Sequence, residues 1–265
     1  MVEEEVAGRA PVLRAFFPDA VAAGALDTRL RGYLASLGVL GFPTPPEPTI
    51  APLADRDWGA AWREHFRPLP VGRRLLVAPP WDVPPASGRV VLTIEPGRAF
   101  GTGHHGSTAS CLALLERVLE RTSPASAIDL GTGSGILAIA AARLGVPAIL
   151  AVDDDPDAVA VAVANAEING VSAGVTCQRA DAAVLDAPPS PLVLANLLAA
   201  AHARLAARYR RLLAPAGALI VGGILDAEVD DVRAHMRAEA LTPVDAVAVD
   251  GWTALECRAP VHDRP

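Results

Sequence analysis

A glycine-rich segment, Asp129-Leu130-Gly131-Thr132-Gly133-Ser134-Gly135, follows an apolar run and precedes a helical pattern. Glycine lets the backbone turn sharply and approach a ligand closely, and free N–H groups at a helix start favour an anionic group. We therefore expect a nucleotide-like cofactor across this turn, in contact with Gly131 and Gly133. The spacing G-x-G-x-G differs from the G-x-G-x-x-G of dinucleotide-binding enzymes, which argues against hydride transfer. A purely structural turn of glycines is the alternative.

Acidic residues stand at the ends of the next two predicted strands. Asp153 ends the second strand, 22 residues after Gly131, where a carboxylate can accept hydrogen bonds from both ribose hydroxyls. The nearby Asp155, followed by Pro156, is expected to cap the next helix rather than bind a ligand. Asp181, after the third strand, could meet an adenine amine or could be a solvated loop acid, and the sequence leaves both interpretations open.

Histidine and cysteine residues form no metal-binding pattern. His104 and His105 are adjacent in a loop, where neighbouring side chains usually point apart, and no third ligand is in sight. We expect such a loop histidine to shape the substrate opening instead. The cysteines are far apart and odd in number, which fits neither a disulfide framework nor a zinc site and suits a reducing compartment: Cys111, Cys177 and Cys257. We therefore predict that the protein holds no metal.

The elements that position these residues alternate between strand and helix from residue 126 onward. Apolar runs separated by helical patterns predict a parallel sheet with strands at 126–130, 148–152, 174–178, 192–196 and 217–222. Residues 243–250 and 252–259 flank Asp250-Gly251 and predict a terminal hairpin. The expected fold class is α/β, with a Rossmann-like seven-stranded sheet of the methyltransferase type that ends in an antiparallel hairpin.

The front of the chain predicts a small α/β domain. It is expected to hold a strand at 12–17, an amphipathic helix at 19–37 ended by Gly38, and a proline-rich connection at 41–52. A helix at 55–66 follows with an aromatic stripe on one face, for which core packing is favoured over ligand binding: Trp58, Trp62 and Phe66. Strands are expected at 73–81 and 89–96. The predicted divisions are residues 1–54, 55–97 and 98–265.

The charge and hydropathy of the chain limit the kinds of binding partner that we expect. The 265 residues include 30 acidic and 23 basic residues, a net charge of −7, so no broad footprint for nucleic acid is visible. The acidic N-terminus is unlike a signal peptide, and the apolar runs are shorter than the ~18 residues that a membrane span needs. We expect a cytoplasmic, monomeric protein that binds neither membranes nor nucleic acid.

The most specific motif is Glu95-Pro96-Gly97-Arg98-Ala99-Phe100-Gly101-Thr102-Gly103-His104-His105-Gly106-Ser107-Thr108. With the glycine segment, the aromatic helix and Asn196-Leu197-Leu198, it resembles the ribosomal protein L-eleven methyltransferase family (PrmA type) over roughly residues 53 to 258. The resemblance implies that S-adenosylmethionine is the cofactor and that amino groups of a large-subunit ribosomal protein are the substrate. It further implies cofactor contacts from Thr108, Gly131, Asp153 and Asn196, while the glycine-hinged loop that contains Thr102 can close over the methyl group. It also implies that the small α/β domain at the front of the chain is an incomplete substrate-recognition domain.

Methyl transfer from a sulfonium mainly requires that the protein place the amine in line with the S–CH₃ bond. Asn196, at the carboxyl end of the fourth strand, could accept a hydrogen bond from that amine and is the predicted catalytic residue; an ordinary capped strand end is the alternative. Asn196-Leu197-Leu198-Ala199 lacks the prolines and the aromatic residue typical of enzymes that methylate planar nitrogens. Other hypotheses are a protein-lysine methyltransferase with another target, such as an electron-transfer flavoprotein, and a non-enzymatic module that binds S-adenosylmethionine.

Overall fold

The computed structural model describes residues 2–4, 12–14, 22–42, 47–50, 66–85, 88–96 and 105–261. The chain divides into two compact units, Met1–Trp58 and Gly59–Pro265. The three-part division that the sequence suggests, with boundaries after residues 54 and 97, stays a prediction. The helix expected at 55–66 lies outside the described residues except for Phe66.

The first unit contains a two-stranded sheet and one helix. Strand β1 (Val2–Glu4) pairs antiparallel with β2 (Val12–Arg14), which lies inside the strand expected at 12–17. Helix α1 spans Ala23–Val39, so it begins later than predicted, because Ala22 is still extended. Every fourth or third residue on one face is a partly covered leucine, as an amphipathic helix requires: Leu26, Leu30, Leu34 and Leu37.

The predicted end of this helix at Gly38 is wrong. Gly38 lies inside α1, and the residue that leaves the helix is Gly41, whose φ of 87° is in the left-handed region. The backbone N–H of Phe42 then donates to the carbonyl of Leu37 at 3.1 Å, which satisfies one of the free carbonyls at the helix end. Gly38 and Gly41 both fit the local rule for a helix end, and only the backbone hydrogen bonds of the folded chain show which of them ends α1.

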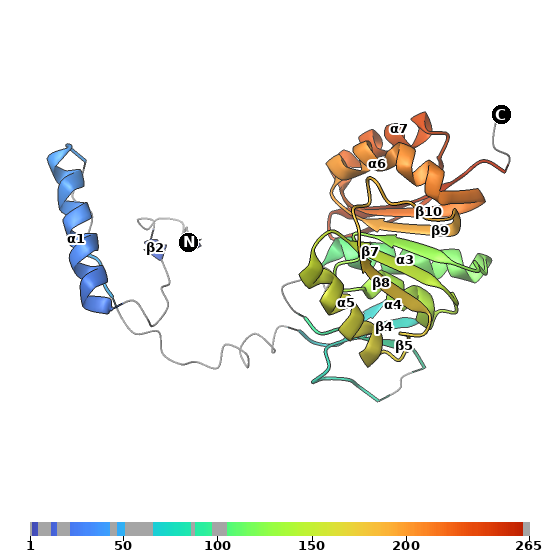
Figure 1. Ribbon diagram of the computed structural model, residues 1–265, viewed down its shortest axis with the longest axis horizontal. Coiled ribbons are helices and arrows are strands. Elements are labelled where there is room, and N and C mark those ends of the chain that lie inside the picture. The colour runs from blue at the N-terminus through green and yellow to red at the C-terminus, as the bar shows by residue number, and fades with distance from the viewer. Residues whose placement is uncertain are drawn as a thin grey trace. The chain divides into compact units, whose positions relative to one another are not determined.

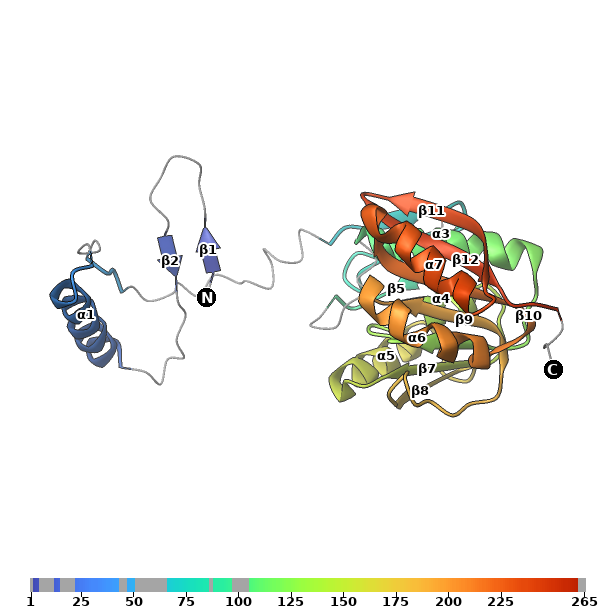
Figure 2. The same ribbon diagram turned by 90° about the horizontal axis from the view of Figure 1, so that it is seen from above.

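The second unit is built on a seven-stranded sheet with the order β11-β12-β10-β9-β6-β7-β8. Five neighbouring strands are parallel, and β12 runs antiparallel to both of its neighbours, which confirms the predicted parallel sheet with a terminal hairpin. Figure 2 shows this order, from β11 at the top to β7 and β8 at the bottom. The strands are β6 (Ala127–Leu130), β7 (Ile149–Asp153), β8 (Val175–Arg179), β9 (Ser190–Asn196), β10 (Leu213–Leu225), β11 (Thr242–Val249) and β12 (Trp252–Arg258).

Two apolar cores cover the two faces of this sheet. One joins the sheet to α3 and α4, and the other joins it to α6 and α7 (Figure 1). The helices are α3 (Gly106–Arg121), α4 (Ile136–Arg143), α5 (Pro156–Ile168), α6 (Ala199–Leu212) and α7 (Val229–Ala238), with the short 3₁₀ helix η1 (Asp226–Glu228) before α7. Among the described residues, no helix has the length and apolar character to cross a membrane.

A separate three-stranded sheet precedes the large one. The runs expected at 73–81 and 89–96 contain β4 (Leu75–Ala78) and β5 (Val90–Thr93), which are parallel to each other. Strand β3 (Leu69–Val71), which the sequence did not indicate, pairs antiparallel with β4. Side chains of this small sheet belong to the same core as α3 and α4, so the segment packs on the large sheet's helices.

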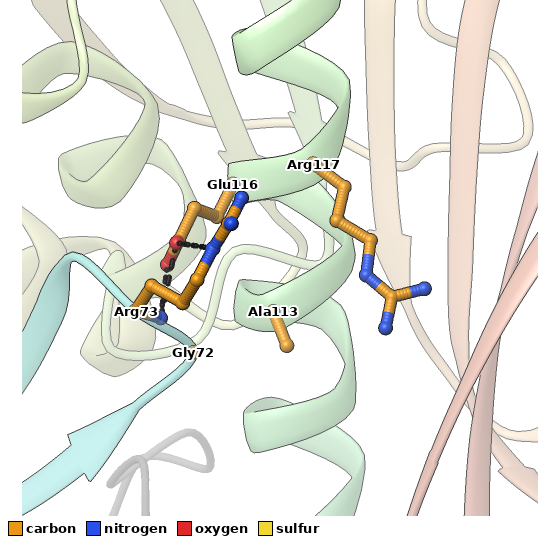
Figure 3. A pocket seen from close by; sticks show the side chains of 5 residues that line it. All are labelled: Gly72, Arg73, Ala113, Glu116 and Arg117. Atoms are coloured by element: carbon orange, nitrogen blue, oxygen red, sulfur yellow. Dashed lines mark hydrogen bonds and ion pairs between the residues drawn. The ribbon is translucent and has the colours of Figure 1, made fainter.

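A buried carboxylate fastens the turn between β3 and β4 to α3. Glu116 is 2% exposed and accepts hydrogen bonds from the backbone N–H groups of Arg73, at 3.0 and 3.1 Å, and of Arg74, at 3.1 Å. A cavity of about 450 Å³ lies beside this contact (Figure 3). The two arginines on its wall pair with acids, Arg73 with Glu120 and Arg117 with Asp245, so the cavity's charged groups already have structural partners.

Candidate active site

The glycine turn lies between β6 and α4 and has an unusual backbone. Gly131, Gly133 and Gly135 all have φ in the left-handed region, at 67°, 54° and 83°. Most other residues are strained there, which explains three glycines within five positions. A side chain at Gly131 would also collide with Leu197, the residue that follows β9. The turn therefore requires glycine both for its conformation and for its close approach to another segment.

Asp129 supports this turn from inside the protein. Its Oδ2 accepts hydrogen bonds from the Thr132 hydroxyl, at 2.6 Å, and from the backbone N–H of Ala138, at 3.2 Å. The carboxyl is 1% exposed, and burial raises its pKa to about 6 because a charged group loses solvation there, although the two hydrogen bonds oppose the shift. Asp129 thus ties the start of the turn to the first turn of α4.

Asp153, at the end of β7, bridges two backbone segments. Its Oδ2 accepts from the N–H of Gly133 at 2.9 Å, and its Oδ1 accepts from the N–H of Asp155 at 3.1 Å. Each carboxylate oxygen can accept more than one hydrogen bond, so this half-buried group keeps capacity for further donors. The predicted cap of α5 is confirmed: Asp155 accepts from the N–H of Asp157 at 2.9 Å, and Pro156 takes the first helical position.

Asn196 and Thr108 meet although 88 residues separate them in the sequence. The Nδ2 of Asn196 donates to Oγ1 of Thr108 at 3.4 Å, and Thr108 is fully buried in the first turn of α3. The Oδ1 of Asn196 is buried and has no hydrogen-bond partner among the described residues. An unsatisfied buried acceptor costs about 1–3 kcal/mol, so it calls for an explanation.

Leu197 connects the two groups of predicted site residues. Its N–H donates to the carbonyl of Gly222 at 3.1 Å, and its side chain lies against Gly131. The structure therefore brings Gly131, Gly133 and Asp153 together at the ends of β6 and β7, beside Asn196 and Thr108 at the end of β9 and the start of α3. The sequence singled out Asn196 and Leu197 as neighbours in a motif, but it held no signal for the packing of Leu197 on Gly131.

The other two predicted ligands are Asp181 and Thr102, of which the structure describes only Asp181. Asp181 follows β8, next to β7, because the N–H of Ala180 donates to the carbonyl of Asp153. Asp181 is exposed, and its Oδ1 accepts from the N–H of Ala183 at 2.8 Å, so it orders a local turn and keeps its other oxygen in solvent. Thr102 and His104 lie outside the described residues.

His105 caps helix α3. Its Nδ1 accepts from the N–H of Ser107 at 3.3 Å, and its ring lies 4.6 Å from that of Trp252, centroid to centroid. Its role at a substrate opening stays a prediction. Among the described residues, no three histidine, cysteine or acidic side chains are grouped so that they could hold a metal ion.

A buried hydrogen-bond chain behind Asn196 was not expected from the sequence. His202 Nε2 lies 2.7 Å from the carbonyl of Gly222, so this nitrogen is the donor, and Nδ1 accepts from the hydroxyl of Tyr209 at 2.9 Å. Burial lowers the pKa of His202 below its usual value, in keeping with a neutral ring. Since Gly222 also accepts from Leu197, this chain fixes the strand ends beside Asn196. Its only sequence signal is two polar residues on one face of α6.

Comparison with known proteins places this chain in a family. The model of the family described as ribosomal protein L11 methyltransferase (PrmA) matches residues 2–260, nearly the whole chain. The chain belongs to the ribosomal protein L11 methyltransferase family. A member from Pelobacter propionicus is 40% identical over 220 residues, which are 80% of this chain and 70% of that protein. One from Pelotomaculum thermopropionicum is 36% identical over 259 residues, 97% of this chain and 82% of that protein.

A solved structure agrees with this assignment. The crystal structure of the ribosomal protein L11 methylase from Lactobacillus delbrueckii subsp. bulgaricus matches with a TM-score of 0.68 and 26% identity, covering 74% of this chain and all of that chain. This L11 methyltransferase family member is therefore an enzyme of the methyltransferase class, and S-adenosylmethionine is its cofactor.

The residues present fit that cofactor. Asn196 offers a buried acceptor that no other described residue satisfies, which suits the ammonium group of a methionyl moiety, and Thr108 beside it carries a hydroxyl. The positive-φ turn gives a ligand close access to the backbone, and Asp153 keeps acceptor capacity at the place where a ribose would lie. Asn196 and Thr108 therefore suit the amino-acid end of the cofactor, and the glycine turn and Asp153 suit its nucleoside end.

Proposed function

We propose that this enzyme transfers methyl groups from S-adenosylmethionine to amino groups of ribosomal protein L11. We further propose that it does so in the cytoplasm as a monomer and without binding nucleic acid directly. The net charge of −7 supports the last point, because a protein that binds a phosphate backbone usually presents a broad basic surface.

The observation that carries the proposal is the Oδ1 of Asn196, which has no hydrogen-bond partner in the part of the chain that the structure describes. An ordinary strand-end cap would use this oxygen within the protein, so the lack of a partner among those residues favours a ligand over the purely structural alternative. We propose that Asn196 and Thr108 hold the methionyl end of the cofactor. Gly131, Gly133 and Asp153 would hold the nucleoside, and Asp181 and Thr102 are further candidate contacts.

S-adenosylmethionine supplies a methyl group that is already activated on a sulfonium, so the task of the protein is to position the amine. A protonated amine has no free electron pair and must lose its proton before it attacks. Asn196 lies at the carboxyl end of a central strand, where substrates meet cofactors in open α/β sheets. Its Oδ1 has two lone pairs, so besides the ammonium of the cofactor it can accept a second hydrogen bond, from the substrate amine.

The test uses the full chain, labelled S-adenosylmethionine and purified ribosomal protein L11. We expect label in L11 with the wild-type enzyme and a large loss of cofactor affinity, measured by calorimetry, in Asp153→Ala. The matched control is Asp154→Ala, which removes an exposed carboxylate one position away. Cofactor binding without label in any protein would identify a binding module, and label only in another protein would identify a different target. Either result would reject the proposed function.

A further inference from the structure

Two asparagines at the end of α5, one inside the helix and one that follows it as the C-cap, are buried although the proposed chemistry uses neither. Asn165 is fully buried and Asn169 is 6% exposed. They are four residues apart, so they lie on the same face of the helix. A buried amide without partners costs free energy, and both side chains are accordingly bound to backbone groups of other segments. The two sets of partners differ, and this difference separates their roles.

Asn165 joins two segments of the site region. Its Oδ1 accepts from the N–H of Glu95 at 3.0 Å, just after β5, and its Nδ2 donates to the carbonyl of Ser134 at 2.8 Å. The partners fix the orientation of the amide, because an N–H can only face the oxygen and a carbonyl can only face the nitrogen. Ser134 lies inside the glycine turn, between two residues with positive φ.

The same helix packs tightly against the turn one residue further on. A side chain at Gly135 would lie 3.1 Å from the Cβ of Ala162, a contact so tight that one of the two segments would have to shift by a few tenths of an ångström. Helix α5 therefore holds the second half of the glycine turn through one close contact and one hydrogen bond. Glycines have more accessible backbone conformations than other residues, so a turn that contains three of them depends on such outside contacts to stay in one conformation.

Asn169 has the same chemistry, but the hydrogen bonds that the structure gives its side chain go to Thr93 and Asn165 and not to the turn. Its Oδ1 accepts from the N–H of Thr93 at 2.9 Å, and its Nδ2 donates to the carbonyl of Thr93 at 2.6 Å and to that of Asn165 at 2.8 Å. It pairs with the end of β5 as a neighbouring strand would. Asn169 therefore fastens β5 to α5 and leaves the glycine turn untouched.

We propose that Asn165 is a positioning residue for the cofactor: its amide fixes the Ser134 carbonyl, and with it the glycine turn, relative to the end of β5. Asn165 touches no reacting atom and acts through the turn. The inference rests on the proposed function, because it requires that S-adenosylmethionine bind at this turn. It predicts that cofactor affinity depends on the Nδ2–H of Asn165 beyond any general loss of stability.

The test compares Asn165→Asp with Asn169→Asp in the full chain. Both changes place a carboxylate oxygen against a backbone carbonyl in a buried site, so we expect similar losses of thermal stability. Only Asn165→Asp removes a bond to the glycine turn. We expect it to raise the Kd for S-adenosylmethionine, measured by calorimetry, by about tenfold or more, while Asn169→Asp stays within about twofold of wild type. Asn165→Ala and Asn169→Ala replace this pair if a buried carboxylate prevents folding.

The outcomes separate this inference from the proposed function. Wild-type protein without affinity for S-adenosylmethionine would overturn both. Wild-type affinity combined with equal Kd values for the two variants, or with an unchanged Kd in the Asn165 variant, would overturn the positioning role alone. Saturating cofactor should restore most of the methylation rate in the Asn165 variant, since the defect lies in binding; a low rate that persists at saturation would also count against the inference.

Discussion

The two ends of the candidate cofactor site differ in how completely the protein satisfies its own polar groups. At the glycine turn, Asp129 and Asp153 each accept two hydrogen bonds from the protein. At the other end, Asn196 presents a buried Oδ1 with no partner among the described residues. At the first end, which we call the turn end, the protein itself supplies hydrogen-bond donors to both carboxylates. The second, the amide end, keeps an acceptor that a ligand can use.

This difference suggests that the turn end and the amide end contribute differently to folding and to cofactor binding. A preorganised turn can receive a nucleoside without rearrangement, whereas an unsatisfied amide gains a hydrogen bond only when a ligand arrives. Changes at the turn end should therefore affect both folding and cofactor binding. Changes at the amide end should affect activity with little loss of stability.

The largest effect is expected for Gly131→Ala at the turn end. A left-handed conformation costs a residue with a side chain about 1–2 kcal/mol, and the added methyl would collide with the end of the Leu197 side chain, so the turn or that side chain must move. We expect the Kd for S-adenosylmethionine to rise by about 100-fold or more, measured by calorimetry. Gly145→Ala is the control, because Gly145 has a φ of 109° but no atom within 4 Å of the added carbon. Equal effects of the two changes would contradict a special role of the turn.

Asn196→Ala tests the amide end. It removes an acceptor that has no partner among the described residues and a donor whose hydrogen bond to Thr108 is long, at 3.4 Å, so we expect a small fall in Tm while kcat/KM falls by about 10²-fold in the labelling assay. Asn196→Asp keeps an oxygen in place, and the Thr108 hydroxyl can reverse its hydrogen bond to donate, so this variant should retain more activity. A large fall in Tm with activity preserved would show that Asn196 is a structural cap.

Asp129→Asn examines the pH dependence of the turn end. Burial holds the folded-state pKa of Asp129 at about 6, above the unfolded value of about 3.9, so the folded protein binds the proton more tightly. The carboxyl therefore lowers the free energy of unfolding as pH rises from about 4 to about 6, by about 2 to 3 kcal/mol. Urea unfolding of both proteins across this range should give a difference that grows with pH in favour of the variant. A constant difference would contradict the raised pKa.

The smallest effect is expected for Tyr209→Phe, behind the amide end. The change removes the donor to Nδ1 of His202 and should cost about 1 kcal/mol of unfolding free energy, with kcat within about threefold of wild type. Tyr33→Phe, at a tyrosine that is 62% exposed, should leave the unfolding free energy unchanged. A much larger fall in kcat for Tyr209→Phe would mean that activity at the amide end depends strongly on the buried hydrogen bond between Tyr209 and His202.

Local signals made several elements predictable from the sequence. The alternation of apolar runs and helical patterns reflects burial on both faces of a parallel sheet, and the expected strands all lie within a few residues of the observed ones. Asp155-Pro156 at the start of α5 and Asp250-Gly251 in the hairpin depend on backbone preferences of adjacent residues, so their roles were visible without a fold. The end of α1 could not be predicted in this way, because Gly38 and Gly41 both satisfy the local preference for glycine after a helix.

What the sequence by itself determined is therefore the fold class, the glycine turn and the order of the candidate ligands along the chain. Only the tertiary structure decided that Leu197 packs on Gly131, that Asn196 reaches Thr108 and keeps a free acceptor, and that Asn165 holds the turn. Each of these contacts joins residues between 31 and 88 positions apart, as the Ser134–Asn165 and Thr108–Asn196 bonds illustrate. Periodicity and propensity report on neighbours in the chain, whereas these contacts exist because the sheet brings distant strand ends to one edge.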